Sequence, residues 1–67
     1  MTNPRIAARI SEEETAARNC DAHVANWTGD TVRERRHRDE ERAEAVRHRQ
    51  LAGVLRELLE YRVKMGY

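Results

Sequence analysis

The sequence has few of the large apolar side chains that usually fill a protein core. It contains no phenylalanine, and aromatic residues make up only 4% of its 67 residues. A domain of this size buries only about 60% of the surface that its unfolded chain exposes. A single domain spanning residues 1–67 is therefore short of core energy, and we expect self-association or a partner to complete its core.

Lysine is nearly absent as well. Only one of the 13 Lys and Arg residues is a lysine, Lys64, while the formal net charge is only +1. This bias is typical of GC-rich coding DNA and indicates a bacterium or one of its phages. Arginine is also the cation whose forked guanidinium binds carboxylates and phosphates, so the positions of the arginines bear on function.

Signals for cross-linking, secretion and membrane insertion are missing too. The single cysteine, Cys20, cannot form a disulfide within one chain. The first ten residues contain no apolar stretch of the length that secretion signals need. Apolar runs such as Val54-Leu55 are far shorter than the roughly 20 residues that span a membrane. We therefore expect a cytoplasmic protein with no membrane partner, or one in a virion or host cytoplasm if it comes from a phage.

What the sequence does contain is a helical pattern in its first part. Asn3 followed by Pro4 is a typical helix start, because Asn caps free amides and proline fits the first turn. Residues then recur at alternating steps of three and four, as along a coiled-coil seam, with Glu13 in the one place that lacks an apolar side chain: Ile6, Ile10, Ala17, Cys20, Val24 and Trp27. This pattern predicts a helix over about residues 4–26. A capping-box spacing at Ser11 and Glu14 leaves a break near Ser11 as the lesser alternative.

A turn and a second, longer helix follow. The turn signal is Thr-Gly-Asp at residues 28–30, and Thr31 with Glu34 has the spacing of a capping box. No proline follows, and Gly66 after Lys64 is a typical helix end, so we predict a long helix over about residues 31–65. Because the connection is short, the two helices form an all-α antiparallel hairpin.

A helical wheel indicates how the second helix is organised. Val32, Ala43, Val54 and Met65 repeat every eleven residues, with Val46, Gln50, Leu58 and Tyr61 nearby, and they form one long face. Folding the chain about a tight turn places Trp27 against Val32, and Ile6 and Ile10 against residues 50–54. Residues 56–65 are then expected to extend beyond the start of the first helix.

The charged run of residues 33–49 separates into two sides on the same wheel. A basic stripe consists of Arg35, Arg38, Arg42, Arg49 and Arg56. The acids on the other side are Glu34, Glu40, Glu41 and Glu44. The basic stripe is suited to a phosphate backbone or an acidic protein surface, and the acidic side to a small inhibitor of an enzyme. A solvated helix held by exposed ion pairs is the simpler interpretation of both.

Cys20 and His23 raise the question of a metal or catalytic site. They are three residues apart, so with His37 or His48 they have donor types that bind zinc. Neither later histidine has a second ligand beside it, however, and no glycine-rich loop supports a Cys and His nucleophile pair. We expect no metal, no cofactor, no small-molecule substrate and no enzymatic activity.

The last third of the chain holds most of the large aliphatic side chains. Two isoleucines of the first helix cannot cover all of them, and an uncovered apolar cluster is typical of an association surface. The residues we expect to bind a partner are Leu51, Leu55, Leu58, Leu59, Tyr61, Val63 and Met65, supported by Ile6 and Ile10. The sequence thus predicts a protein-binding or assembly protein that docks onto copies of itself or onto a larger complex. Nucleic-acid binding through the basic stripe and enzyme inhibition through the acids remain as alternatives.

Overall fold

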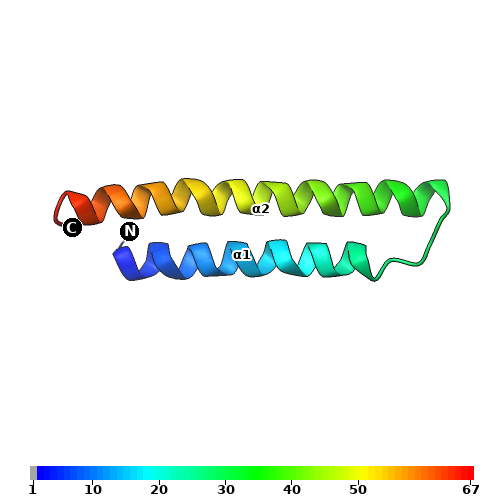
Figure 1. Cartoon of the computed structure of the whole chain (residues 1–67), viewed down its shortest axis with the longest axis horizontal. Helices are drawn as coiled ribbons and strands as arrows, with labels where there is room; N and C mark the ends of the chain where they lie inside the picture. The colour runs from blue at the N-terminus through cyan, green and yellow to red at the C-terminus, as the bar shows by residue number, and fades with distance from the viewer. Residues whose placement is uncertain (1) are drawn as a thin grey trace.

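The chain forms a hairpin of two antiparallel helices. The computed structural model describes residues 2–67, in which helix α1 comprises Asn3–Ala25 and helix α2 comprises Val32–Lys64. The two helices lie side by side in a rod whose Cα atoms extend over 53 × 15 × 13 Å (Figure 1). The prediction of an all-α antiparallel hairpin is confirmed.

The start of α1 differs from the prediction by one residue. Thr2 is the N-cap, and its hydroxyl accepts a hydrogen bond from the amide of Arg5. Asn3 lies in the first turn and binds the end of α2 instead. Its Nδ2 donates to the carbonyl of Tyr67 at 2.6 Å, and its Oδ1 accepts from Nε of Arg62 at 2.9 Å. The Asn3 side chain therefore ties the two chain ends together rather than capping its own helix.

The predicted capping signal at the start of α2 is confirmed. The hydroxyl of Thr31 accepts from the amide of Glu34 at 3.1 Å and donates to its carboxylate at 2.8 Å. A side chain at Gly29 would overlap the carboxylate of Glu34 and displace it. The other capping-box spacing starts no helix, because α1 runs through Ser11 without a break.

The predicted end of α2 at Gly66 is also confirmed. The helix ends at Lys64, and Gly66 takes a left-handed conformation with φ of 89°. The amide of Gly66 donates to the carbonyl of Val63 at 3.1 Å, and that of Tyr67 donates to Arg62 at 2.9 Å. These are the two hydrogen bonds of a Schellman motif, which satisfy carbonyls that a helix end otherwise leaves free.

Helix α2 packs on α1 along a row of residues spaced alternately by three and four, and we call this contact between the two helices the seam. The buried and half-buried residues of this row are Glu34, Arg38, Glu41, Ala45, His48, Ala52, Leu55, Leu59 and Arg62. The face with the eleven-residue repeat lies on the outside, since Val32 and Val54 are 67% and 62% exposed. Trp27, which we expected to lie against Val32, stacks on His37 with ring centroids 5.3 Å apart.

The apolar core is small and lies toward the end of the rod where the two termini meet. Ile6 is completely buried and Ile10 is nearly so. Both belong to one cluster with Ala52, against which Leu55 and Leu59 pack. Farther toward the turn the buried apolar residues of the seam are alanines, so the helices there are held mainly by polar contacts.

The expected overhang of residues 56–65 beyond α1 is wrong. Arg56 forms an ion pair with Glu14, and Arg62 binds Asn3, so α1 runs beside nearly the whole C-terminal part of α2. The prediction assumed a tight turn, whereas the connection of residues 26–31 is stretched along the rod (Figure 1). The extra length of α2 therefore lies at the turn end, where only the connection accompanies it.

Replacing Ile6 with alanine tests this core. The cavity in a fully buried site predicts a loss of about 2–5 kcal/mol in the free energy of unfolding, which a hairpin with so few core residues tolerates poorly. The measurement is urea unfolding followed by circular dichroism. Val63→Ala, at a site that is 60% exposed, is the matched control and should change stability by less than about 0.5 kcal/mol. Equal effects of the two substitutions would contradict the assigned core.

Candidate functional site

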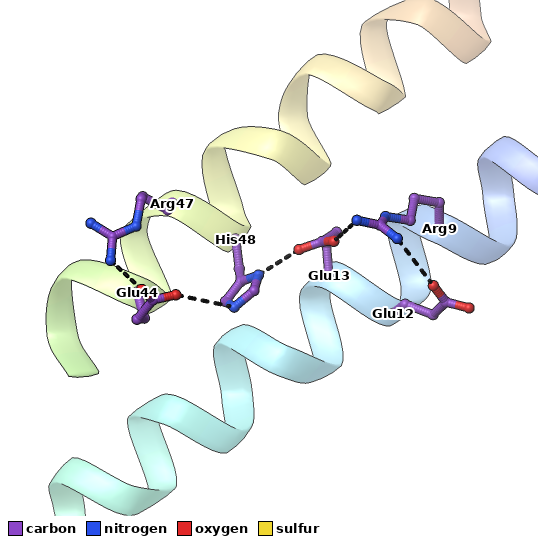
Figure 2. Close-up of polar contacts among 6 residues, drawn as sticks. All are labelled: Arg9, Glu12, Glu13, Glu44, Arg47 and His48. Atoms are coloured by element: carbon purple, nitrogen blue, oxygen red, sulfur yellow. Dashed lines mark hydrogen bonds and ion pairs between the residues drawn. The ribbon is translucent and has the colours of Figure 1, made fainter. Parts of the chain in front are cut away.

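A carboxylate occupies the middle of the seam. Glu13 is only 6% exposed and lies between an arginine and a histidine. Arg9, one turn earlier on α1, approaches one of its oxygens at 2.9 Å, and Nδ1 of His48 on α2 approaches the other at 2.5 Å (Figure 2). A buried charge is tolerated only when it is paired and hydrogen-bonded. The contact between Glu13 and His48 therefore favours one register of the two helices over others.

Further charged groups extend this contact across the outside of the rod. Nε2 of His48 lies 3.7 Å from Glu44, which in turn accepts a hydrogen bond from Arg47 (Figure 2). That hydrogen bond holds the pKa of Glu44 below its ordinary value. At the other end, Arg9 reaches Glu12 at 3.9 Å. Three carboxylates alternate with two guanidiniums and one imidazole along the series, and each of these groups already contacts a neighbour in it.

The structure places the basic stripe of the sequence beside α1, where acids engage much of it. Arg49 pairs with Asp21, and Arg56 pairs with Glu14. The hydrogen bond that Arg49 donates to Asp21 raises the pKa of Arg49 above its ordinary value. Two of the arginines expected to face a partner thus contact the other helix of the same chain.

The remaining members of that stripe have weaker or different contacts. Arg42 lies 3.4 Å from Asp39, and Arg35 lies 4.0 Å from Asp30, both with exposed side chains. Arg38 belongs to the seam rather than to the stripe, and its Nε is buried without a hydrogen-bond partner among residues 2–67.

The four acids that were grouped together in the sequence do not form one free surface. Glu34 is bound to Thr31, and Glu44 is bound to Arg47. Glu41 is half-buried in the seam, 3.8 Å from Nδ1 of His23. Glu40 is the member that stays exposed without an ion pair in the described part of the chain.

The possible zinc ligands are distributed over different contacts. Cys20 lies at the seam, His37 stacks on Trp27, and His48 binds Glu13. Within residues 2–67 no three His, Cys, Asp or Glu side chains gather closely enough to hold a metal ion. Burial raises the pKa of the Cys20 thiol, and a hydrogen bond with Glu41 raises it further.

The expected partner-binding residues divide into a covered set and an exposed set. Ile6, Ile10, Leu55 and Leu59 belong to the hairpin's own core. The exposed members include Leu51 at 39%, Leu58 at 40%, Tyr61 at 60% and Met65 at 59%. With Val54, which the sequence had not assigned to this group, they follow a spacing of three and four along α2. We call these five residues the apolar stripe: Leu51, Val54, Leu58, Tyr61 and Met65.

Val63 is also exposed but does not belong to the apolar stripe. It follows Arg56 by seven residues, as Arg56 follows Arg49, and therefore lies on the same side of α2 as these two arginines. A row of exposed large side chains next to the seam is unusual for a monomer, because isolated exposed apolar residues are ordinary whereas contiguous ones mark interaction sites. The apolar stripe is therefore the candidate functional site.

A second feature lies at the opposite end of α2 and was not anticipated from the sequence. The first two turns of α2 form an open hollow of about 510 Å³ lined by Val32, Arg33, Arg36, His37 and Glu40. No carboxylate within residues 2–67 lies within ion-pair distance of Arg33 or Arg36. Helix α1 has ended at this level, so nothing from it neutralises them. We call this feature the basic hollow.

Comparisons of the chain with protein-family models, curated proteins and solved structures gave no match. Neither described helix has the length and apolar character required to cross a bilayer.

The surroundings of Cys20 predict slow reaction with thiol reagents. The thiolate is the reactive form, and a raised pKa lowers its population at a given pH. Alkylation by iodoacetamide at pH 8.5 should thus be several times slower in the folded protein than in urea. Glu41→Gln should accelerate it while leaving helicity unchanged. A folded-state rate equal to the rate in urea would contradict the assigned environment.

Proposed function

We infer that this chain is a non-enzymatic protein-binding protein that associates through the apolar stripe. The observation that carries this proposal is the row of five large side chains, each at least 39% exposed, on the helix that contributes Ala52, Leu55 and Leu59 to the core. Leu55 and Leu59, one position after Val54 and Leu58, pack against α1. The stripe is therefore continuous with the core and borders it directly.

The energy available from covering the stripe is large for a chain of this size. Complete burial of a side chain such as Leu or Val contributes about 1.5–3 kcal/mol, and total stabilities are usually about 5–15 kcal/mol. In the described part of the chain, the buried apolar residues are Ile6, Ile10 and three alanines. Association would therefore add appreciably to the apolar surface that the fold removes from water.

The contacts of the charged residues favour protein association over the two alternatives. Arg49 and Arg56 already bind Asp21 and Glu14, so a nucleic acid would have to compete with acids of the same chain. An inhibitor surface would need several free acids, whereas Glu40 is the exposed and unpaired one of the proposed four within residues 2–67. The expectations of a cytoplasmic location and of a bacterial or phage source stay predictions.

Site-specific cross-linking in the native host tests the proposal. A photoreactive amino acid at Tyr61, which is 60% exposed, should give adducts with protein, because the apolar stripe is covered in the assembled state. Adding Leu58→Glu should reduce these adducts by tenfold or more, since burial of a new charge is costly. The adducts are measured by mass spectrometry.

The matched control carries the same photoreactive group at Arg18, which is exposed on α1. It should give few adducts, and Leu58→Glu should not alter them. Adducts mainly with nucleic acid at position 61, or protein adducts equally strong at both positions, would overturn the proposed function.

A further inference from the structure

Helix α2 carries unpaired charges of opposite sign at its two ends. Arg33 and Arg36 lie in the basic hollow near its start. Glu57 and Glu60 lie beside the apolar stripe near its end and are exposed. Among residues 2–67, no partner of opposite charge lies within ion-pair distance of any of the four. In both pairs the two charges are three residues apart, which places them one turn from each other on the helix surface.

These charges face away from α1. Arg36, Ala43, Gln50 and Glu57 are seven residues apart and all exposed, and they form the row of α2 that lies opposite the seam. A second copy of α2, laid antiparallel along this row, can therefore approach without displacing α1. The outer row also has small or flexible members near its middle, which permits a close approach.

One alignment of two antiparallel copies brings charges of opposite sign to the same ends of the pair. When Arg36 of one copy lies opposite Glu57 of the other, Arg33 and Glu60 lie at the same height on the two flanks of this contact, and symmetry repeats the arrangement at the other end. The two-fold axis then passes beside Val46, which is 52% exposed. Close to this axis, Glu44 of each copy comes within reach of Arg47 of the other copy, so charges of opposite sign also meet there.

The same alignment covers apolar surface. It brings Leu58 and Val54 of one copy over the basic hollow of the other. There the aliphatic parts of Arg33 and Arg36, together with Val32 and the ring of His37, provide apolar contact area. The basic hollow and the apolar stripe are thus complementary parts of one surface that pairs with itself.

We propose that a second copy of this chain covers the apolar stripe, in a two-fold dimer whose α2 helices pair antiparallel with the basic hollow of each receiving the C-terminal half of the other. This inference rests on the proposed function and names the protein that is bound. A self-complementary surface of this kind closes after two copies, because each patch meets the other across the axis.

Charge reversal with rescue tests the dimer. Sedimentation equilibrium should show a dimer for the wild type. Arg33→Glu with Arg36→Glu places four acids together at each end, and Glu57→Arg with Glu60→Arg does the same with four cations. Each double variant should weaken dimerisation by more than tenfold. An equal mixture of the two should form a heterodimer, and a chain carrying all four substitutions should again form a homodimer.

The control is Arg5→Glu with Arg18→Glu, which makes the same charge change on exposed positions of α1 and should leave the dimer intact. A monomeric wild type, double variants that dimerise normally, or a mixture without heterodimer would each overturn the dimer. The cross-linking experiment distinguishes a failure of the dimer from a failure of the proposed function. Adducts between position 61 and a protein of different mass would support protein binding but contradict the dimer. An absence of protein adducts would contradict both proposals.

Discussion

The packing of Ile6 and Ile10 against Ala52, Leu55 and Leu59 is the contact on which the rest of the structure depends. Within residues 2–67, large apolar side chains of both helices meet away from water here, and burial of such surface is the main favourable term in folding. Once it forms, Glu13 lies opposite His48 and Asn3 lies beside Tyr67. The polar contacts then select this register, because a shift along the seam would leave the buried carboxylate without its imidazole partner.

The small size of that core also explains the character of the outer surface. Toward the turn the buried apolar residues Ala17 and Ala45 allow close approach but bury little area. Much of the large apolar surface of α2 lies outside the seam, in the apolar stripe, which the hairpin does not cover. In the proposed dimer this surface and the basic hollow complete each other, so the residues that the hairpin leaves without partners are the ones that association uses.

Short sequence motifs predicted the helices and their ends, whereas contacts between residues far apart in the sequence could not be predicted. Thr31, Glu34 and Gly66 act within one or two turns of their own positions, so their roles follow from spacing alone. The register depends on the path of residues 26–31, which no local rule specifies. The basic stripe was found on the wheel, but its pairing with Asp21 and Glu14 required the position of α1. The sequence of α2 contains periodicities of both seven and eleven residues, so it did not determine which side of this helix packs on α1. The residues that do pack there include alanines and His48, which are not the most apolar residues of the helix.

The register of the two helices is tested most directly by nuclear Overhauser effects in the isotopically labelled protein. The account predicts cross-peaks between the methyl groups of Ile10 and Ala52, and between the rings of Trp27 and His37, whose centroids are 5.3 Å apart. Cross-peaks from Trp27 to the methyl groups of Val32 in place of those to His37 would indicate a tight turn and a different alignment of the helices. That result would contradict the core, the polar seam and the exposure of the apolar stripe together.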